Sequence, residues 1–300
     1  MRTIIYCFSG TGNTLKVADL YKSHLGEDTM IYQVREENDK FPDPNNFDMV
    51  GIAYPIHGFN MPQYFYRFLK KLPNVDGKKL FIMKTSGEGL HLNDCSSQKA
   101  IRLLKKKGFD VVLERHIVMP YNMIYRHTDG MAKQMWIYAK ALSKINCDEI
   151  LEGKRMKVTL PFYKKWYAFF FRILWPFTHV HGPLFRVNKK KCLKCNKCVK
   201  ICPTQNIKVT EKGKYKFGTK CTLCMGCSFS CPKSAINVGI FRFWKVNGSY
   251  NVERLSANKD IKFPYIDGTE KGIYKLYRKY YRECNKRLEE KGIDINEYNN

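Results

Sequence analysis

Eight of the twelve cysteines in this chain fall into two copies of one pattern, and cysteine thiolates at such a spacing can hold iron and sulfur. The copies are Cys192-x-x-Cys195-x-x-Cys198-x-x-x-Cys202-Pro203 and Cys221-x-x-Cys224-x-x-Cys227-x-x-x-Cys231-Pro232. Zinc sites favour two separate C-x-x-C pairs or a mixture of Cys and His, and disulfides need an oxidising compartment. The pattern therefore predicts two 4Fe–4S clusters. Because each cluster carries one electron at a time, the chain is expected to move electrons.

The two copies form an internal repeat at an offset of 29 residues (221 − 192). Ile207 and Val209 match Ile236 and Val238, so each copy predicts a Cys-rich loop, a short helical turn and a strand. The repeat resembles bacterial ferredoxins, in which the fourth Cys of each run ligates the other cluster. This resemblance implies ligand sets that cross between the copies. One is Cys192, Cys195, Cys198 and Cys231, and the other is Cys221, Cys224, Cys227 and Cys202.

A loop rich in glycine and hydroxyl groups predicts a second cofactor site. An apolar run at 3–8 predicts a buried strand, and a helical pattern starts at Leu15. Between them stand Ser9, Gly10, Thr11, Gly12, Asn13 and Thr14. Backbone N–H groups and the helix dipole favour a phosphate at such a turn. The loop lacks the Lys of a Walker A site, and Leu15 replaces the third glycine of the dinucleotide fingerprint. It closely resembles the FMN-phosphate loop of flavodoxins.

Strand and helix patterns alternate through the first half of the chain. Further strands are expected at 30–34, 48–54, 79–85 and 110–119, the last nearer the sheet edge, and helices at 63–71, 94–107 and 131–151. This alternation predicts an α/β doubly wound parallel sheet of the flavodoxin type. The cysteine repeat predicts a second, small α+β domain of the bacterial ferredoxin type, with a pseudo-two-fold repeat.

Two more loops are expected to hold the flavin, since FMN in the flavodoxin order lies beyond the carboxyl ends of the strands. The predicted cofactor-binding residues are Tyr54, Pro55, Ile56, His57, Gly58 and Phe59 after the third strand, and Thr85, Ser86 and Gly87 after the fourth. Tyr54, His57 and Phe59 could flank the ring; equally, Tyr54 could lie in the core and His57 could cap a backbone group. The resemblance implies that a backbone group of Gly58 meets flavin N5. Residues 119–122 could also border the ring.

The resemblance to a flavodoxin fused with a two-cluster ferredoxin, an arrangement found in anaerobes, implies four parts. They are an FMN-binding domain at 1–155, an aromatic and basic linker at 156–186, a two-cluster domain at 187–240 and an extension at 241–300 with an amphipathic helix near 272–291. The linker run 163–175 could join the two cofactor domains or lie on a membrane surface. The sequence shows no 18-residue apolar stretch and no signal-peptide pattern, and cluster cysteines must stay reduced, so we expect a cytoplasmic protein.

The chain is strongly basic, which departs from the acidic character usual in flavodoxins. Its net charge is +26, from 53 Lys and Arg against 27 Asp and Glu, and residues 151–220 hold 18 of these bases and 2 of the acids. The excess could steer an acidic redox partner or hold anionic lipid, or it could reflect a Lys-rich genome. Nucleic acid is the least favoured partner, because it would need a basic stripe with exposed aromatic side chains.

These features predict an electron-transfer flavoprotein or oxidoreductase that relays electrons between FMN and two 4Fe–4S clusters. Its partner would be a redox protein or a small reductant. The alternatives are an FMN-dependent reductase of a small substrate and, from another class, a nucleic-acid-binding redox sensor. Lysines 194, 197 and 200 surround the first cysteine run, whereas Leu223, Met225 and Phe229 stand in the second. The first cluster is therefore expected to have the higher potential.

Overall fold

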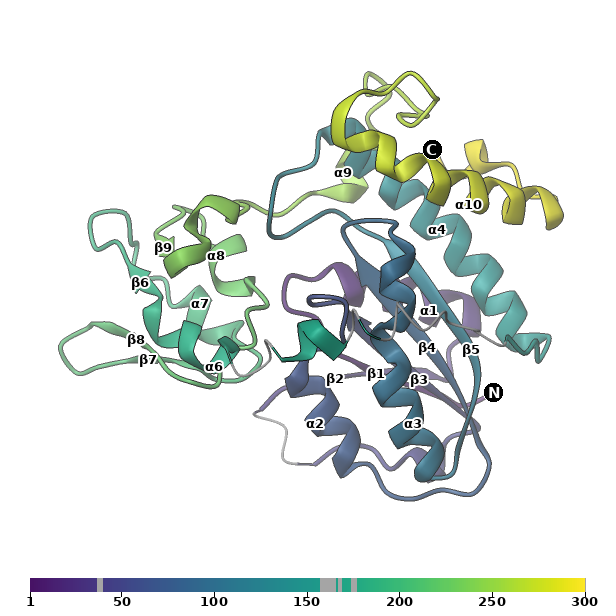
Figure 1. Ribbon diagram of the computed structural model, residues 1–300, viewed down its shortest axis with the longest axis horizontal. Coiled ribbons are helices and arrows are strands. Elements are labelled where there is room, and N and C mark those ends of the chain that lie inside the picture. Colours follow the sequence, from purple (N-terminus) through teal and green to yellow (C-terminus); the bar gives the residue numbers. More distant parts are fainter. Residues whose placement is uncertain (37–39, 157–165, 167–168, 174–176, 300) are drawn as a thin grey trace.

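The computed structural model describes residues 1–36, 40–156, 166, 169–173 and 177–299. Figure 1 shows two bodies: a larger one built around a sheet, and a smaller one that carries the cysteine repeat. The expected linker run at 163–175 lies largely outside the described residues, although residues 166 and 169–172 are helical.

The larger body is a five-stranded parallel sheet in the order β2-β1-β3-β4-β5. Its strands are β1 Thr3–Cys7, β2 Thr29–Gln33, β3 Met49–Pro55, β4 Lys78–Ser86 and β5 Phe109–Val118. This is the flavodoxin-like order of the doubly wound fold. The predicted fold class is therefore confirmed, and β5 lies at the edge as expected. Each predicted strand lies within a residue or two of its observed bounds.

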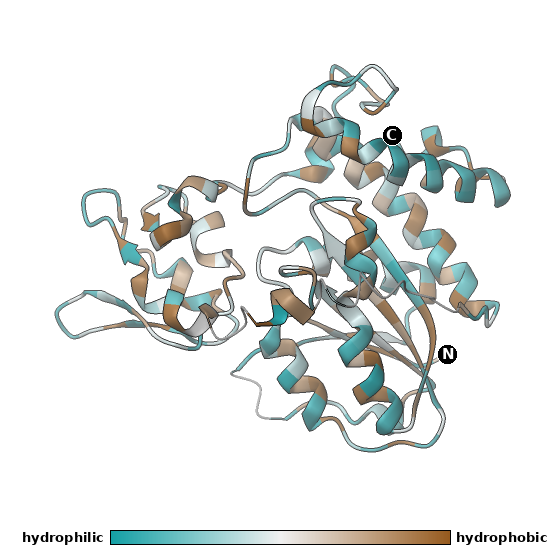
Figure 2. Cartoon of the chain, in the orientation of Figure 1, coloured by the Kyte–Doolittle hydropathy of each residue, from teal (hydrophilic) through white to brown (hydrophobic). Residues whose placement is uncertain are grey.

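Helices cover both faces of this sheet because its strands are apolar on both sides. The helices are α1 Asn13–Leu25, α2 Gln63–Lys71, α3 Gln98–Lys106 and α4 Asp129–Leu151. Within β1, Ile5 belongs to the core cluster shared with α1 and α4, whereas its neighbours Ile4 and Tyr6 belong to the cluster shared with α2 and α3. In Figure 2 the covering helices alternate between hydrophobic and hydrophilic residues, as this burial requires.

One predicted helix begins differently. The expected helix at 94–107 is a 3-10 helix at His91–Ser97 followed by α3. Side chains of the first segment bond to the sheet rather than to their own turn: Ser97 donates to the buried Glu114 carboxylate, and Ser96 bonds to the Tyr54 hydroxyl. Glu114 also forms a buried ion pair with Lys84 of β4. Serine side chains that bond elsewhere favour irregular turns over α-helix.

The C-terminal extension packs on the larger body. It contains α9 Val252–Ala257, 3-10 helices at Gly272–Tyr277 and Ile295–Tyr298, and α10 Arg278–Glu290. The expected amphipathic helix near 272–291 is thus a 3-10 turn followed by α10, whose buried side chains join the core on the α4 side.

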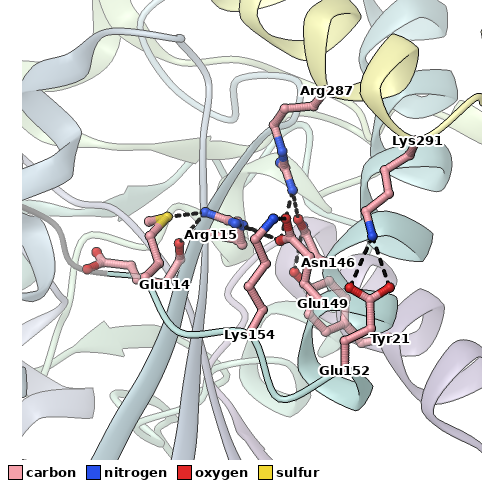
Figure 3. Close-up of polar contacts among 10 residues, drawn as sticks. Tyr21, Glu114, Arg115, Asn146, Glu149, Glu152, Lys154, Arg287 and Lys291 are labelled. Carbon is pink, nitrogen blue, oxygen red and sulfur yellow. Dashed lines mark hydrogen bonds and ion pairs between the residues drawn. The ribbon is translucent and has the colours of Figure 1, made fainter.

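A polar cluster fixes α10 to α4 and β5 (Figure 3). The Glu149 carboxylate of α4 is buried and accepts from Arg115 of β5 at 2.6 Å and from Arg287 of α10 at 3.1 Å. Burial alone would raise the pKa of Glu149, but the hydrogen bonds and charges of the two arginines outweigh it and lower that pKa. The Glu149 carboxylate therefore stays ionised and holds three elements together.

The smaller body consists of short elements. It contains α6 Phe177–His181, a 3-10 helix at Gly182–Leu184, β6 Arg186–Val187, α7 Lys197–Lys200, β7 Ile207–Val209, β8 Tyr215–Phe217, α8 Gly226–Phe229, β9 Ile236–Asn237 and a 3-10 helix at Gly239–Trp244. β6 pairs with β9, and β7 pairs with β8, both antiparallel. The strand before the first cysteine run thus pairs with the strand after the second, which ties the two copies into one unit.

Among the described residues, no helix is long and apolar enough to cross a membrane.

Candidate functional site

The loop between β1 and α1 has the backbone shape of an anion site. Gly12 occupies the N-cap position of α1 with a φ of 100°, a left-handed conformation that favours glycine. The Ser9 hydroxyl accepts hydrogen bonds from the N–H groups of Gly12 at 3.2 Å and Leu15 at 3.3 Å. With no side chain at the N-cap, the other first-turn N–H groups of α1 face the loop, and the helix dipole favours an anion there.

Hydrogen bonds bring this loop together with two other predicted segments. The Thr14 hydroxyl is buried and bonds to the Thr85 hydroxyl at the end of β4, at 2.8 Å. Asn13 donates to the Pro120 carbonyl at 2.7 Å, and Asn122 donates to the Thr11 hydroxyl at 3.2 Å. The loops that follow β1, β4 and β5 therefore meet at the carboxyl end of the sheet, where the parallel strands end.

The loop after β3 lies at the same end of the sheet. His57 and Asn60 exchange backbone hydrogen bonds of 2.9 and 3.1 Å across a turn in which Gly58 and Phe59 have positive φ. Phe171 of the linker packs edge-on against Phe59, with ring centroids 4.9 Å apart, and Arg172 donates to the Asn60 side chain at 3.1 Å. The described linker residues thus pack against one part of this loop, Phe59 and Asn60. Gly58 itself is exposed.

The Tyr54 side chain does not face the loops at this end of the sheet. Its side chain is fully buried, packs against Phe65 of α2 and bonds to Ser96. Of the two interpretations open for Tyr54, the structure places it in the core, whereas Pro55, Ile56 and His57 are partly exposed.

The loop after β4 carries a glutamate that the sequence patterns did not single out. Glu88 accepts from Asn93 at 2.5 Å and from the Tyr121 hydroxyl, and Asn93 also donates to Ser86 at 3.2 Å. Burial raises the pKa of Glu88. The Tyr121 ring lies so close to Gly87 that an added Cβ would meet it at 2.0 Å, so glycine is required there.

The two cysteine runs have the same backbone. Residues with positive φ recur at the 29-residue offset, in the pairs Lys194 and Leu223, Asn196 and Met225, and Gln205 and Ser234. So do α7 and α8, and so do the N–H groups that donate to cysteine sulfur. Those bonds are Lys194 to Cys192 and Leu223 to Cys221, both at 3.4 Å, Asn206 to Cys202 at 3.3 Å and Ala235 to Cys231 at 3.2 Å.

The predicted ligands group as the crossed pairing requires. Cys192, Cys195, Cys198 and Cys231 line one cavity of about 30 Å³, which brings the fourth cysteine of the second run to the first run. Cys202 of the first run lies close enough to Cys221, Cys224 and Cys227 to influence their ionisation. No group of three or more His, Cys, Asp or Glu in the described ranges is arranged to hold a single metal ion. Four thiols with N–H donors on their sulfurs fit an iron–sulfur cluster chemically, because such bonds stabilise its negative charge.

The second cysteine run lies directly against the phosphate-type loop. A Cβ added to Gly10 would meet the Cys224 Cβ at 2.5 Å and its Sγ at 2.9 Å, and one added to Gly226 would meet the Gly10 carbonyl oxygen at 2.2 Å. Two glycines therefore allow the backbones of the two bodies to touch. Asn122, which bonds to Thr11, also donates to the Cys224 carbonyl at 3.3 Å.

Other contacts support this junction. The backbone of Thr222 lies close to the His57 ring, and partial burial lowers the pKa of His57 to about 4, so the imidazole is neutral at pH 7. Glu36 pairs with Lys220 at 2.6 Å, and its N–H donates to the Pro203 carbonyl at 2.8 Å. The junction is thus polar and glycine-lined, and residues from four sheet loops, those after β1, β2, β3 and β5, contribute to it.

Comparison with known proteins agrees with the cysteine-rich half of this architecture. The family model of a 4Fe-4S binding domain matches residues 184–207. The chain joins a flavodoxin-like sheet to a 4Fe-4S binding domain. No curated protein matches the chain.

Solved structures similar to the sheet body include a flavoprotein in complex with FMN from Lactobacillus acidophilus, with 16% identity, a TM-score of 0.32, and coverage of 38% of this chain and 92% of that one. A flavodoxin from the domain Archaea has 14% identity, a TM-score of 0.36 and coverage of 50% and 99%. An FMN-dependent NADH-azoreductase from Bacillus anthracis has 11% identity, a TM-score of 0.35 and coverage of 50% and 99%. With values this low, the fold assignment rests on the strand order.

Proposed function

We propose that this chain is an electron relay in which the sheet body holds FMN and the cysteine repeat holds two 4Fe–4S clusters. The observation that carries the proposal is the contact between Gly10 of the phosphate-type loop and Cys224 of the second cysteine run. It sets a predicted cluster ligand directly against the predicted flavin site. The FMN bound by the similar flavoprotein from Lactobacillus acidophilus and the match to a 4Fe-4S binding domain support the cofactors.

The predicted ligand sets then define an order. The set Cys221, Cys224, Cys227 and Cys202 is proximal to the flavin site, and the set Cys192, Cys195, Cys198 and Cys231 is distal to it. FMN takes up two electrons and two protons in total, whereas each cluster passes one electron at a time. Two electrons that enter at the distal set would pass in turn through the proximal set to the flavin. The reverse flow would release them singly.

The protein's own groups support each part of this relay. The α1 N-terminus and the Ser9–Thr14 loop would hold the phosphate, and the loops after β3 and β4 would border the ring. Phe171 and Arg172 pack against part of the loop after β3, which favours a relay over a reductase with an open substrate site above the ring. The N–H donors to the cysteine sulfurs would stabilise the charge of the clusters.

Cofactor content tests the proposal directly. Protein purified anaerobically should contain one FMN and about eight Fe, because two four-iron clusters need eight thiolates. Full occupancy with about four Fe, or FAD in place of FMN, would contradict it. Chemical reduction of the clusters should be followed by reduction of the flavin in the same molecule, at a rate independent of protein concentration.

A paired variant tests the phosphate loop. Thr11→Ala with Thr14→Ala should weaken FMN binding by about a hundredfold or more, since each of the two lost hydroxyl bonds to an anion is worth about 1.5–3 kcal/mol. The cluster absorbance should stay unchanged in this variant. Unaltered FMN affinity would remove the loop from the site.

A further inference from the structure

We infer that the outer surface of the first cysteine run is the docking site for an acidic one-electron carrier protein. The surface, here called the lysine face, comprises Lys189, Lys190, Lys191, Leu193, Lys194 and Lys197. The inference deepens the proposed relay and rests on it, since it names the partner class that exchanges electrons with the distal set.

The internal symmetry of the cysteine repeat is the first argument. The second run uses Cys224 and Gly226 to contact the sheet body at Gly10, and its Thr222 lies close to His57. At the 29-residue offset these positions correspond to Leu193, Cys195 and Lys197 of the first run. One of two equivalent surfaces is therefore already a docking surface inside the chain. Its counterpart, the lysine face, is exposed.

The exposure of the cysteines is the second argument. All eight predicted ligands are among the described residues, and Cys195 alone of them is exposed. It lines the small distal cavity together with Leu193 and Lys197, and Leu193 is 60% exposed. An electron carrier must approach a cluster closely, and Cys195 is where the polypeptide covers the distal set least.

Charge identifies the partner. Residues 182–235 contain 13 Lys and Arg and one acid, Glu211. None of the lysines of the face forms an ion pair with a described residue. Unpaired lysines around a single exposed aliphatic side chain match the charged rim and apolar centre of a transient protein interface. A negatively charged carrier would be steered to this surface.

The composition of the face favours a protein over a membrane or a nucleic acid. Leu193 is its one apolar side chain, and it contains no aromatic residue. Interfacial membrane binding needs an apolar surface to bury, and binding of single-stranded nucleic acid uses aromatic stacking. The exposed aromatic side chains of the described chain, such as Phe169, Phe170 and Phe243, belong to other segments.

Stopped-flow kinetics on the loaded protein test the inference. The donor is a reduced small ferredoxin rich in Asp and Glu, and the signal is bleaching of the cluster absorbance. We expect a second-order rate constant that falls steeply as salt rises. The variant Lys189→Gln, Lys190→Gln, Lys191→Gln should react about tenfold more slowly at low salt and depend less on salt.

A matched control separates local from total charge. Lys71, Lys105 and Lys106 are exposed and lie at the C-terminal ends of α2 and α3. That end of the sheet is opposite the phosphate-type loop. Changing all three to Gln removes the same three charges but should leave the rate within about twofold of the original. Equal slowing of both triple variants, or a rate that does not depend on salt, would overturn the inference.

Two further arms distinguish the other outcomes. Photoreduction by a deazaflavin needs no protein docking, so bleached clusters that never reduce the flavin would disprove the relay while the docking kinetics stand. Flotation with vesicles containing phosphatidylglycerol reports on lipid. Vesicle binding that the lysine triple variant loses, with unchanged kinetics toward the ferredoxin, would assign the face to a membrane instead.

Discussion

The two cysteine runs share one backbone but have opposite surroundings. Their left-handed residues, short helices and N–H donors to sulfur coincide at the 29-residue offset. The residues between the cysteines do not. Lysines 194, 197 and 200 of the first run stand where the second has Leu223, Gly226 and Phe229. The lysines are exposed, whereas Gly226 and Phe229 are buried.

This difference shows how a symmetric unit can acquire a direction. The shared backbone places the sulfurs, so it is the same in both copies. The side chains between the cysteines decide what each copy contacts: the second meets the sheet body through Gly10, and the first faces solvent. Position 226 has no room for a side chain, because the Gly10 carbonyl lies within 2.2 Å of where a Cβ would be.

Exchanging the residues at these equivalent positions should give the largest effect. Gly226→Lys should push the second run away from Gly10. Electron transfer between clusters and flavin should then slow steeply, because the tunnelling rate falls exponentially as the distance between the cofactors grows. The measurement is the rate of flavin reduction after rapid reduction of the clusters.

Lys197→Gly is the reciprocal control. Residue 197 is exposed, so removal of its side chain disturbs no packing. Electron transfer between the clusters and the flavin should therefore stay at the original rate. If both variants transfer equally fast with full cofactor content, the Gly10 contact does not carry the relay.

The potentials of the two clusters provide a smaller test. Nearby positive charge favours the reduced cluster, which is more negative. Changing Lys194, Lys197 and Lys200 to Gln should therefore lower the midpoint potential of the distal cluster by an amount on the order of tens of millivolts, limited by solvent screening. A redox titration followed by electron paramagnetic resonance measures it, with the proximal cluster as internal reference. Midpoints that do not move would mean that the lysines act in docking alone.

Local patterns predicted most of the fold because they depend on neighbours in sequence. The apolar runs predicted the strands, the resemblance to flavodoxins implied their order, and the cysteine spacing predicted the repeat. The junction could not be predicted in this way. Gly10 has a sufficient local explanation as a phosphate-loop glycine, and nothing nearby indicates that Cys224, 214 residues later (224 − 10), needs the same space. The residues around Gly226 likewise give no local sign of the contact with Gly10. The difference between Gly226 and its equivalent Lys197 was the one sign of it within the repeat.

Other parts of the site depend on long-range polar contacts. Glu88 is held by Tyr121, in the loop after β5, and by Asn93, in the 3-10 helix before α3. The 3-10 start before α3 follows from serine side chains that bond to Glu114 and Tyr54 in the sheet. Hydrophobic periodicity carries no information about such bonds, so a continuous helix was the natural prediction there.

The histidine at the junction gives the smallest expected effect, and it concerns stability. His57 lies close to Thr222 of the second run, whereas the equivalent Leu193 of the first run is exposed. The folded-state pKa of His57 is about 4, below the ordinary value of 6.5. An unfolded chain therefore binds a proton more readily, so the stability contributed by the neutral imidazole is present above pH 6.5 and is lost as pH falls toward 4.

Between pH 7.5 and 5 the loss of stability should be about 1–2 kcal/mol. His57→Gln should lose correspondingly less over that range, as measured by chemical denaturation under anaerobic conditions. His127 also has a pKa of about 4 because of burial, and its ring stacks on Tyr121. His127→Gln should therefore flatten the pH dependence to a similar extent. If His57→Gln leaves the pH dependence of the whole protein intact, the junction does not depend on a neutral imidazole.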